Sequence, residues 1–131
     1  MQTLQIRNST AEFLIFTKQN KEKTIEVIVD EETVWLSQKL MSELFGTTRN
    51  NITMHLTNIF NNELEEKSVC KDFLHTASDG KKYKTKYYNL DVIIAVGFKV
   101  NSERAIEFRI WAINILKQYS IKGYVLEIER L

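Results

Sequence analysis

Hydrophobic residues near the start of the chain follow a period of two. In the stretch EFLIFTKQNKEKTIEVIV, residues 12 to 29, three apolar residues between positions 25 and 29 occupy every second position. This period is typical of a strand buried on one face, so we predict two strands around a lysine-rich loop. An acidic turn, Asp30 to Glu32, separates them from a further apolar run, Val34-Trp35-Leu36.

After this run the period changes to that of a helix. Apolar residues recur at steps of three and four: Leu40, Met41, Leu44 and Phe45. Ser37 stands where a helix N-cap is expected, and Gly46 can end the helix because glycine adopts the left-handed conformation without strain. We therefore predict a short helix between these two residues.

A second amphipathic helix is predicted directly after Gly46. Thr48 can cap its first turn. Its apolar stripe consists of Ile52, Leu56, Ile59 and Phe60. Two short helices joined by a glycine-containing turn are typical of the helix-turn-helix motif, in which the second helix enters a groove of DNA.

The spacing within this pair follows the helix-turn-helix pattern without insertion. Gln38, Ser42, Gly46 and Ile52 occupy positions that suit the pattern, with a small residue where the helices cross and a glycine in the turn. His55 departs from it, because an apolar residue is usual there. We expect the neighbouring Leu56 to take over its packing.

The polar face of the second helix carries many hydrogen-bond donors. No acidic residue occurs from Thr48 to Asn62. Arginine can read guanine and asparagine can read adenine through paired hydrogen bonds in the major groove. Threonines and asparagines at a helix start can also serve only as caps, and we favour DNA contact over that alternative. The candidate residues are Thr48, Arg49, Asn50, Thr53 and Thr57.

The segment DFLHTASDGKKYKTKYYN, residues 72 to 89, predicts a β-hairpin. Asp79-Gly80 lies between two alternating runs, which is a strong hairpin signal. On the returning strand, lysines share one face, and tyrosines and a threonine share the other. From Lys67 to Tyr88, six lysines stand against two aspartates. The hairpin is therefore predicted to be basic.

Two compatible interpretations explain these lysines. A basic hairpin that follows a recognition helix can lie along the phosphate backbone, as the wing of a winged helix does. Lysines can equally protect an edge strand from pairing with another molecule. The candidate phosphate contacts are Lys81, Lys82, Lys84 and Lys86.

Two further helices are predicted in the C-terminal third. Leu90 to Val96 forms a buried helix that Asn89 opens and Gly97 loosens at its end. A longer helix begins at Asn101 or Ser102 and runs through Ser120, with only a narrow polar strip.

The long helix carries more apolar surface than a small domain easily buries alone. We expect one flank to join the core and the other to offer a homodimer face. This second flank consists of Ile106, Ile110 and Ile113. Arg109 falls inside the apolar arc, and because a buried arginine needs a partner we predict an ion pair with Asp91, Glu107 or a chain terminus.

Composition limits the class of protein. With 131 residues, 44% of them hydrophobic and 27% charged, the chain has the size of a single domain. Its formal net charge is only +1, so any interaction with nucleic acid must depend on local charge. No stretch resembles a membrane span or a signal peptide, and the single cysteine excludes an internal disulfide. We expect a cytoplasmic protein.

The sequence offers little support for catalysis. His55, His75 and Cys70 do not have the spacing of a zinc site. A thiolate-imidazole pair between Cys70 and His75 is conceivable, but a lone cysteine at the start of a strand is far more often a packing residue. No glycine-rich phosphate loop or nucleophile elbow occurs. We therefore expect neither an enzyme nor a metal or cofactor site.

Three stretches resemble the N-terminal region of the RhuM family of bacterial virulence-associated proteins. They are ETVWLSQKLMSELFGTTRNNITMHLTNIF, SVCKDFLHTASDGKKYKTKYYNLDVIIAVGFKVNSERAIEFRIWA and ILKQYSIKGYVLEIERL. The segment Glu103 to Trp111 is also similar, more weakly, to the end of phage Bro-N type domains, which are associated with DNA binding. The resemblance implies a mobile-element or pathogenicity-island origin and a DNA-binding role, and supplies no catalytic residues. Family members are generally longer, so the chain resembles their N-terminal part.

These observations together predict an α+β fold. We expect residues 1–131 to form one winged helix-turn-helix-like domain with a small antiparallel sheet and a long C-terminal helix. The expected function is that of a nucleoid-associated transcriptional regulator that binds double-stranded DNA, with the helix at about residues 48–61 in the major groove. The alternative is a protein-interaction or dimerisation module that does not bind nucleic acid.

Overall fold

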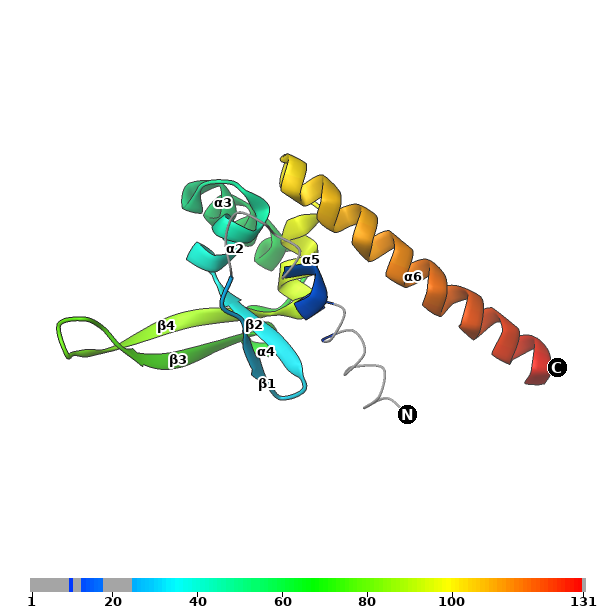
Figure 1. The fold of residues 1–131 in the computed structure, drawn as a ribbon, viewed down its shortest axis with the longest axis horizontal. Helices are drawn as coiled ribbons and strands as arrows, with labels where there is room; N and C mark the ends of the chain where they lie inside the picture. Colours follow the sequence, from blue (N-terminus) through cyan, green and yellow to red (C-terminus); the bar gives the residue numbers. More distant parts are fainter. Residues whose placement is uncertain (1–9, 11–12, 18–24, 131) are drawn as a thin grey trace.

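The structure, a computed structural model, describes residues 10, 13–17 and 25–130, with side chains as far as Lys117. It combines helices with a small antiparallel sheet, so the predicted α+β class is confirmed (Figure 1). The elements after residues 13–17 are β1 (Ile28–Asp30), β2 (Thr33–Ser37), α2 (Gln38–Phe45), α3 (Arg49–Asn62), α4 (Glu66–Val69), β3 (Cys70–Thr76), β4 (Lys82–Asn89), α5 (Leu90–Gly97) and α6 (Glu103–Arg130).

The first strand predicted near the N-terminus is wrong, because residues 13–17 are helical. Phe13 and Phe16 are both buried, and the centre of the Phe16 ring lies 5.5 Å from that of Phe108 and 5.3 Å from that of Trp111. A short continuous apolar run fits a strand or a helix equally well. Packing against α6 therefore decides the conformation of this segment.

The strands of the described residues form one sheet in the order β1-β2-β4-β3, with every neighbouring pair antiparallel. β1 and β2 form one hairpin, and β3 and β4 form the other. The pairing of Leu36 with Tyr88 joins the two hairpins side by side. The second predicted strand is confirmed only from Ile28 onward, and the predicted lysine-rich loop, residues 18–24, lies outside the described residues.

The helix pair predicted around Gly46 is confirmed in its boundaries. The Oγ of Ser37 accepts a hydrogen bond from the backbone N–H of Leu40 at 3.2 Å. Gly46 ends α2 with φ 61°, which a side chain would make costly. The Oγ1 of Thr48 accepts from the N–H of Asn51 at 3.1 Å and so caps α3. The ends of α2 and the start of α3 are therefore set by hydrogen bonds and backbone conformation within four residues of each boundary.

His55 behaves as its unusual position in the pattern predicts. It is half-buried, whereas the neighbouring Leu56 is buried and packs in the core. Burial, helped by the charge of Lys99, lowers the pKa of His55, so the imidazole is neutral at pH 7. Leu56 therefore does take over the packing that the pattern expects here.

The predicted C-terminal helices form, although the second is longer than expected. The Oδ1 of Asn89 accepts from the N–H of Val92 at the start of α5. The Oγ of Ser102 accepts from the N–H of Ala105 and donates to the carbonyl of Phe45, which ties the start of α6 to the end of α2. The predicted end of the long helix is wrong, because α6 continues past Ser120 to Arg130. No proline follows to stop it.

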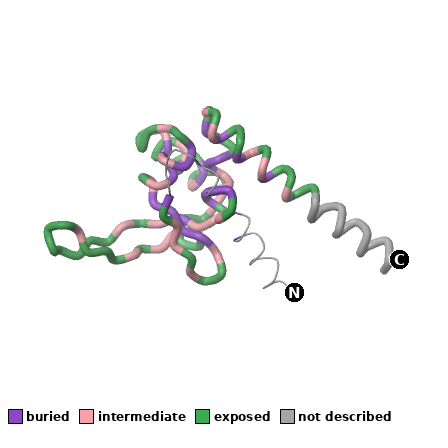
Figure 2. Tube along the Cα trace, viewed as in Figure 1, coloured by how far each residue is buried: buried purple, intermediate pink, exposed green. Residues whose placement is uncertain are grey.

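Buried residues gather where the sheet meets α2, α3, α5 and α6, and the tip of the β3–β4 hairpin is exposed (Figure 2). Residues 13–17 pack against the first part of α6. Farther along its length, α6 extends away from the body (Figure 1). Within the described residues the core is thus one cluster, and the β3–β4 hairpin and α6 project from it.

Arg109 has different partners from those predicted. Its Nη1 donates to the backbone carbonyls of Gly97 at 3.1 Å and Val100 at 2.8 Å. Among the described residues no carboxylate pairs with it, because Glu107 is bonded to Arg104 instead. The carbonyls at the end of a helix carry partial negative charge and need donors, so Arg109 joins α6 to the end of α5 without an ion pair.

Candidate nucleic-acid interface

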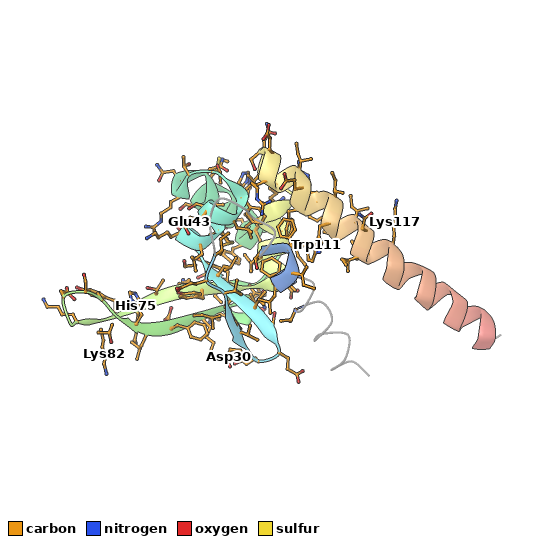
Figure 3. The ribbon with its side chains drawn as sticks, viewed as in Figure 1. Asp30, Glu43, His75, Lys82, Trp111 and Lys117 are labelled. Carbon is orange, nitrogen blue, oxygen red and sulfur yellow. The ribbon has the colours of Figure 1, made fainter. Side chains whose placement is uncertain are left out.

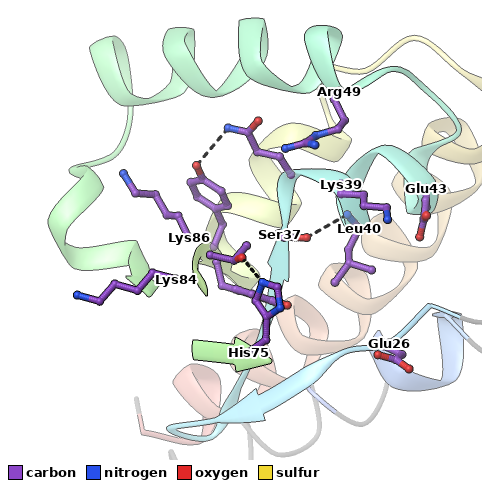
Figure 4. Close-up of a pocket in the computed structure, with 13 residues that line it drawn as sticks. Glu26, Ser37, Lys39, Leu40, Glu43, Arg49, His75, Lys84 and Lys86 are labelled. Atoms are coloured by element: carbon purple, nitrogen blue, oxygen red, sulfur yellow. Dashed lines mark hydrogen bonds between the residues drawn. The ribbon is translucent and has the colours of Figure 1, made fainter. Parts of the chain in front are cut away.

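A cleft of about 720 Å³ opens between the start of α2, the start of α3 and the β3–β4 hairpin (Figure 4). We call it the basic cleft, after the residues that give it its chemistry: Lys39, Arg49, His75, Lys84 and Lys86. They come from four elements, the helix pair α2 and α3 and the hairpin strands β3 and β4. The fold therefore concentrates charge that the net value of +1 does not reveal.

The five polar residues predicted on the second helix are all exposed: Thr48, Arg49, Asn50, Thr53 and Thr57. Arg49 is the first residue of α3 and lines the basic cleft. Its side chain is therefore placed between the helix face and the hairpin. The other four lie along the exposed face of α3 outside the cleft lining.

Several hydroxyl groups on this face already take part in bonds of the helix. The Oγ1 of Thr48 accepts the capping bond, as the alternative interpretation of the threonines requires. The Oγ1 of Thr57 donates to the carbonyl of Thr53 at 3.0 Å. These hydroxyls already bond to the backbone of the helix, whereas the side chains of Arg49 and Asn50 are exposed at its start.

The hairpin lysines divide into two groups. Lys84 and Lys86 line the basic cleft together with Arg49. Lys81 and Lys82 are exposed near the hairpin tip and do not line it; Figure 3 shows Lys82 there. The structure therefore brings together only part of the predicted phosphate-binding set.

Ion pairs reduce the positive charge of the hairpin region below the value counted from the sequence. The Nζ of Lys71 lies 2.7 Å from the Oδ2 of Asp30, the last residue of β1, and 2.7 Å from the Oε1 of Glu31 in the turn that follows. Lys86 lies 2.8 Å from Glu66, and this hydrogen bond raises the pKa of Lys86. Lys84 differs from both, because it is an exposed cation of the cleft for which the structure gives no acidic partner among the described residues.

Gln38 connects the three elements around the cleft. Its Nε2 donates to the hydroxyl of Tyr88 at 3.3 Å, and its Oε1 accepts from the Oγ1 of Thr53 at 3.0 Å. It therefore links α2 to β4 and to α3. Burial raises the pKa of Tyr88, so its hydroxyl stays protonated at neutral pH and keeps this geometry.

Lys39 and His75 line the cleft although the sequence interpretation did not select them. Lys39 is the second residue of α2 and is exposed. The Nε2 of His75 lies 2.8 Å from the Oγ1 of Thr85 across the hairpin. The available signal was weak: a lysine at a helix start, where an acid is favoured.

Acidic residues occupy one side of the cleft. Glu26 and Glu43 lie on the side opposite Lys84 and Lys86 (Figure 4). Of the described lining residues, four are cationic and two are acidic. An anionic ligand would therefore lie toward the hairpin and Arg49 and away from the two glutamates.

The conceivable Cys70–His75 pair is excluded by geometry. The two residues lie five positions apart on β3, so they point to opposite faces and are separated by roughly 16 Å. Burial raises the pKa of Cys70 to about 11. The thiol is thus protonated at neutral pH and is a poor nucleophile.

A sequence model of the Virulence protein RhuM family matches residues 68–131. This confirms the resemblance over β3, β4, α5 and α6 and supports the assignment of the chain to that family. The match does not include α2 and α3. No curated protein and no solved structure matches the chain.

Two further features concern the described part of the chain. None of its helices is both long enough and apolar enough to cross a membrane. Within the same residues, no group of three or more His, Cys, Asp or Glu side chains is arranged to hold a metal ion.

Proposed function

We propose that this chain is a DNA-binding domain of the winged helix-turn-helix type. In this arrangement α3 lies in the major groove and the β3–β4 hairpin is the wing on the phosphate backbone. The observation that supports it best is that Arg49 of α3 and Lys84 and Lys86 of the hairpin line one cleft. A duplex that contacts α3 would then meet the hairpin as well.

The starts of α2 and α3 support the same proposal. Neither helix has an acidic residue in its first turn, and these turns contain Lys39 and Arg49 instead. An acid near a helix start stabilises it by about 0.3–1 kcal/mol, whereas a cation there does not. A phosphate group can supply the missing negative charge, because free N–H groups and the helix dipole both favour an anion.

The wider role of the domain belongs to the same proposal. A chain that resembles the Virulence protein RhuM family over residues 68–131 and binds double-stranded DNA would act as a mobile-element or virulence-associated transcriptional regulator on the bacterial nucleoid. Thr48, Asn50, Thr53 and Thr57 would complete the base-reading face around Arg49. Lys81 and Lys82 would contact phosphates farther along the duplex.

A second candidate function is a protein-interaction module. The observation that favours it is the exposure of large apolar side chains along α6. Exposed apolar surface of this kind often marks a protein contact. In this alternative the basic cleft has no nucleic-acid partner.

Binding of pooled duplex fragments, measured by fluorescence anisotropy over a series of salt concentrations, tests the proposal. We expect binding at low salt that weakens steeply as salt rises. Arg49→Glu and Lys84→Glu should each abolish it. Lys67→Glu changes the charge equally at an exposed residue outside the cleft lining, and should retain most of the affinity. Equal losses in all three variants, or no binding by the unmodified chain at low salt, would contradict the proposal.

A further inference from the structure

One face of α6 is apolar and exposed. Ile106, Ile110 and Ile113 are 45%, 56% and 43% exposed, at steps of four and three residues. The opposite face is buried in the core through Ala105, Phe108 and Ala112. Isoleucines at such steps share one side of a helix. The described part of the fold leaves this side uncovered.

Two opposite charges continue the same face at its ends. Glu103 lies three residues before Ile106, and Lys117 lies four residues after Ile113. The resulting steps of three, four, three and four residues are those of the contact positions in a coiled coil. Trp111 points toward the body, whereas Lys117 points away from it (Figure 3). We call this set, Glu103 to Lys117, the α6 face.

The charges determine which pairing of two α6 faces is favourable. In a parallel pair in register, Glu103 lies against Glu103 and Lys117 against Lys117, so like charges meet at both ends. In an antiparallel pair, Ile110 lies opposite Ile113 of the second copy, and Glu103 lies within about one helical turn of Lys117 of that copy. Only the antiparallel pair combines apolar contact with charge complementarity.

We propose that two copies of this chain associate through their α6 faces in antiparallel orientation. The hairpin and α6 extend from the body in opposite directions (Figure 1), so the contact does not use the residues of the basic cleft. A two-fold axis at α6 would present two identical clefts, as a site with two symmetric halves requires. The contact itself does not depend on DNA binding.

Sedimentation velocity of the full chain over a range of concentrations tests the contact. We expect a reversible dimer. Ile110→Glu places a charge in the centre of the contact of both copies and should raise the dissociation constant at least about 100-fold. Leu74→Glu is the matched control, because Leu74 is 66% exposed on the hairpin, and it should leave the dissociation constant unchanged. Circular dichroism shows whether both variants fold.

Charge reversal tests the orientation. Glu103→Lys and Lys117→Glu should each raise the dissociation constant roughly two- to thirtyfold, and the double variant should restore it. In a parallel pair neither single change creates a new repulsion, so unchanged values would overturn the antiparallel arrangement. A monomer at every concentration, or a dimer that Ile110→Glu does not weaken, would overturn the contact as a whole.

Discussion

The two hairpins of the sheet share one architecture and differ in almost everything else. The β1–β2 hairpin contributes buried residues, with Trp35 and Leu36 at 4% and 0% exposure. The β3–β4 hairpin projects from the body, and its tip is exposed (Figure 2). One hairpin therefore belongs to the core, and the other extends a basic surface into solvent.

Their turns differ in the same way. Glu31 and Glu32 adopt φ 53° and 62° in the β1–β2 turn, a left-handed conformation that costs roughly 1–2 kcal/mol per residue without glycine. Lys71 holds this turn from β3 through the carboxylates of Asp30 and Glu31. In the other turn Gly80 takes φ 81°, as the Asp-Gly signal predicts.

The difference shows how each turn is maintained. The Asp79-Gly80 turn is stabilised locally, because Asp79 accepts bonds from the N–H of Lys81 and the hydroxyl of Tyr83. The acidic turn depends on tertiary contacts, because Lys71 of β3 holds its carboxylates and the Oγ1 of Thr10 donates to the Glu32 carbonyl at 3.1 Å. An exposed hairpin that keeps its shape by itself can meet a ligand without support from the core.

The largest expected effect separates the two hairpins by stability. Leu36→Ala should lower the free energy of unfolding by about 2–5 kcal/mol, because it leaves a cavity in a fully buried site. Leu74→Ala removes the same atoms from an exposed site and should change it by less than about 0.5 kcal/mol. Urea unfolding measures both. Similar losses in the two variants would mean that the exposed part of the β3–β4 hairpin also contributes to the stability of the core.

The next effect concerns DNA binding. Arg49→Ala should weaken binding at a selected site by about 1–3 kcal/mol and relax base choice there, whereas Lys84→Ala should weaken all sequences alike and reduce the salt slope by about 1. Lys71→Ala is the control, because that lysine is bound to the acidic turn. Binding-site selection followed by anisotropy titrations distinguishes these outcomes. If Lys71→Ala lowered the salt slope as much as Lys84→Ala, the distinction between the ion-paired lysine and the lysine of the basic cleft would be wrong.

The turns should respond to glycine in opposite directions. Glu32→Gly relieves a left-handed glutamate and should raise the free energy of unfolding by up to about 1 kcal/mol. Gly80→Ala introduces the same strain at the other turn and should lower it by about 1 kcal/mol. Thermal unfolding of the two variants measures the signs. A loss in both variants would show that the acidic turn is not strained.

The smallest effect is a difference in pH dependence. The hydrogen bond from Lys71 lowers the pKa of Asp30, and the hydrogen bond from Tyr83 lowers the pKa of Asp79. Since both values lie below those of the unfolded chain, about 3.9, the stabilisation is present above that pH and is lost as pH falls through the folded values. NMR titration should show that Lys71→Met raises only the pKa of Asp30, and that Tyr83→Phe raises only that of Asp79. A change in the pKa of both aspartates in either variant would mean that the two turns are not independent.

Local signals predicted much of the fold correctly. The caps at Ser37, Thr48 and Asn89 and the turns at Gly46 and Gly80 all form as expected. Each depends on side chains and backbone groups within about four residues of one another. For the candidate site, the same signals identified the exposed start of α3 and the basic hairpin, because both are properties of single elements.

The features of the fold and of the basic cleft that local signals did not predict depend on tertiary structure. It made residues 13–17 a helix through contact with Phe108 and Trp111, and it bound Lys71 and Lys86 to acids of other elements. It also placed Lys39 beside Arg49 and Lys84 in one cleft. The sequence by itself determined the local elements and their charges, because caps, turns and periodicity act over a few residues. Which charges are paired and which remain exposed depends on neighbours that are brought together only when the sheet and helices pack.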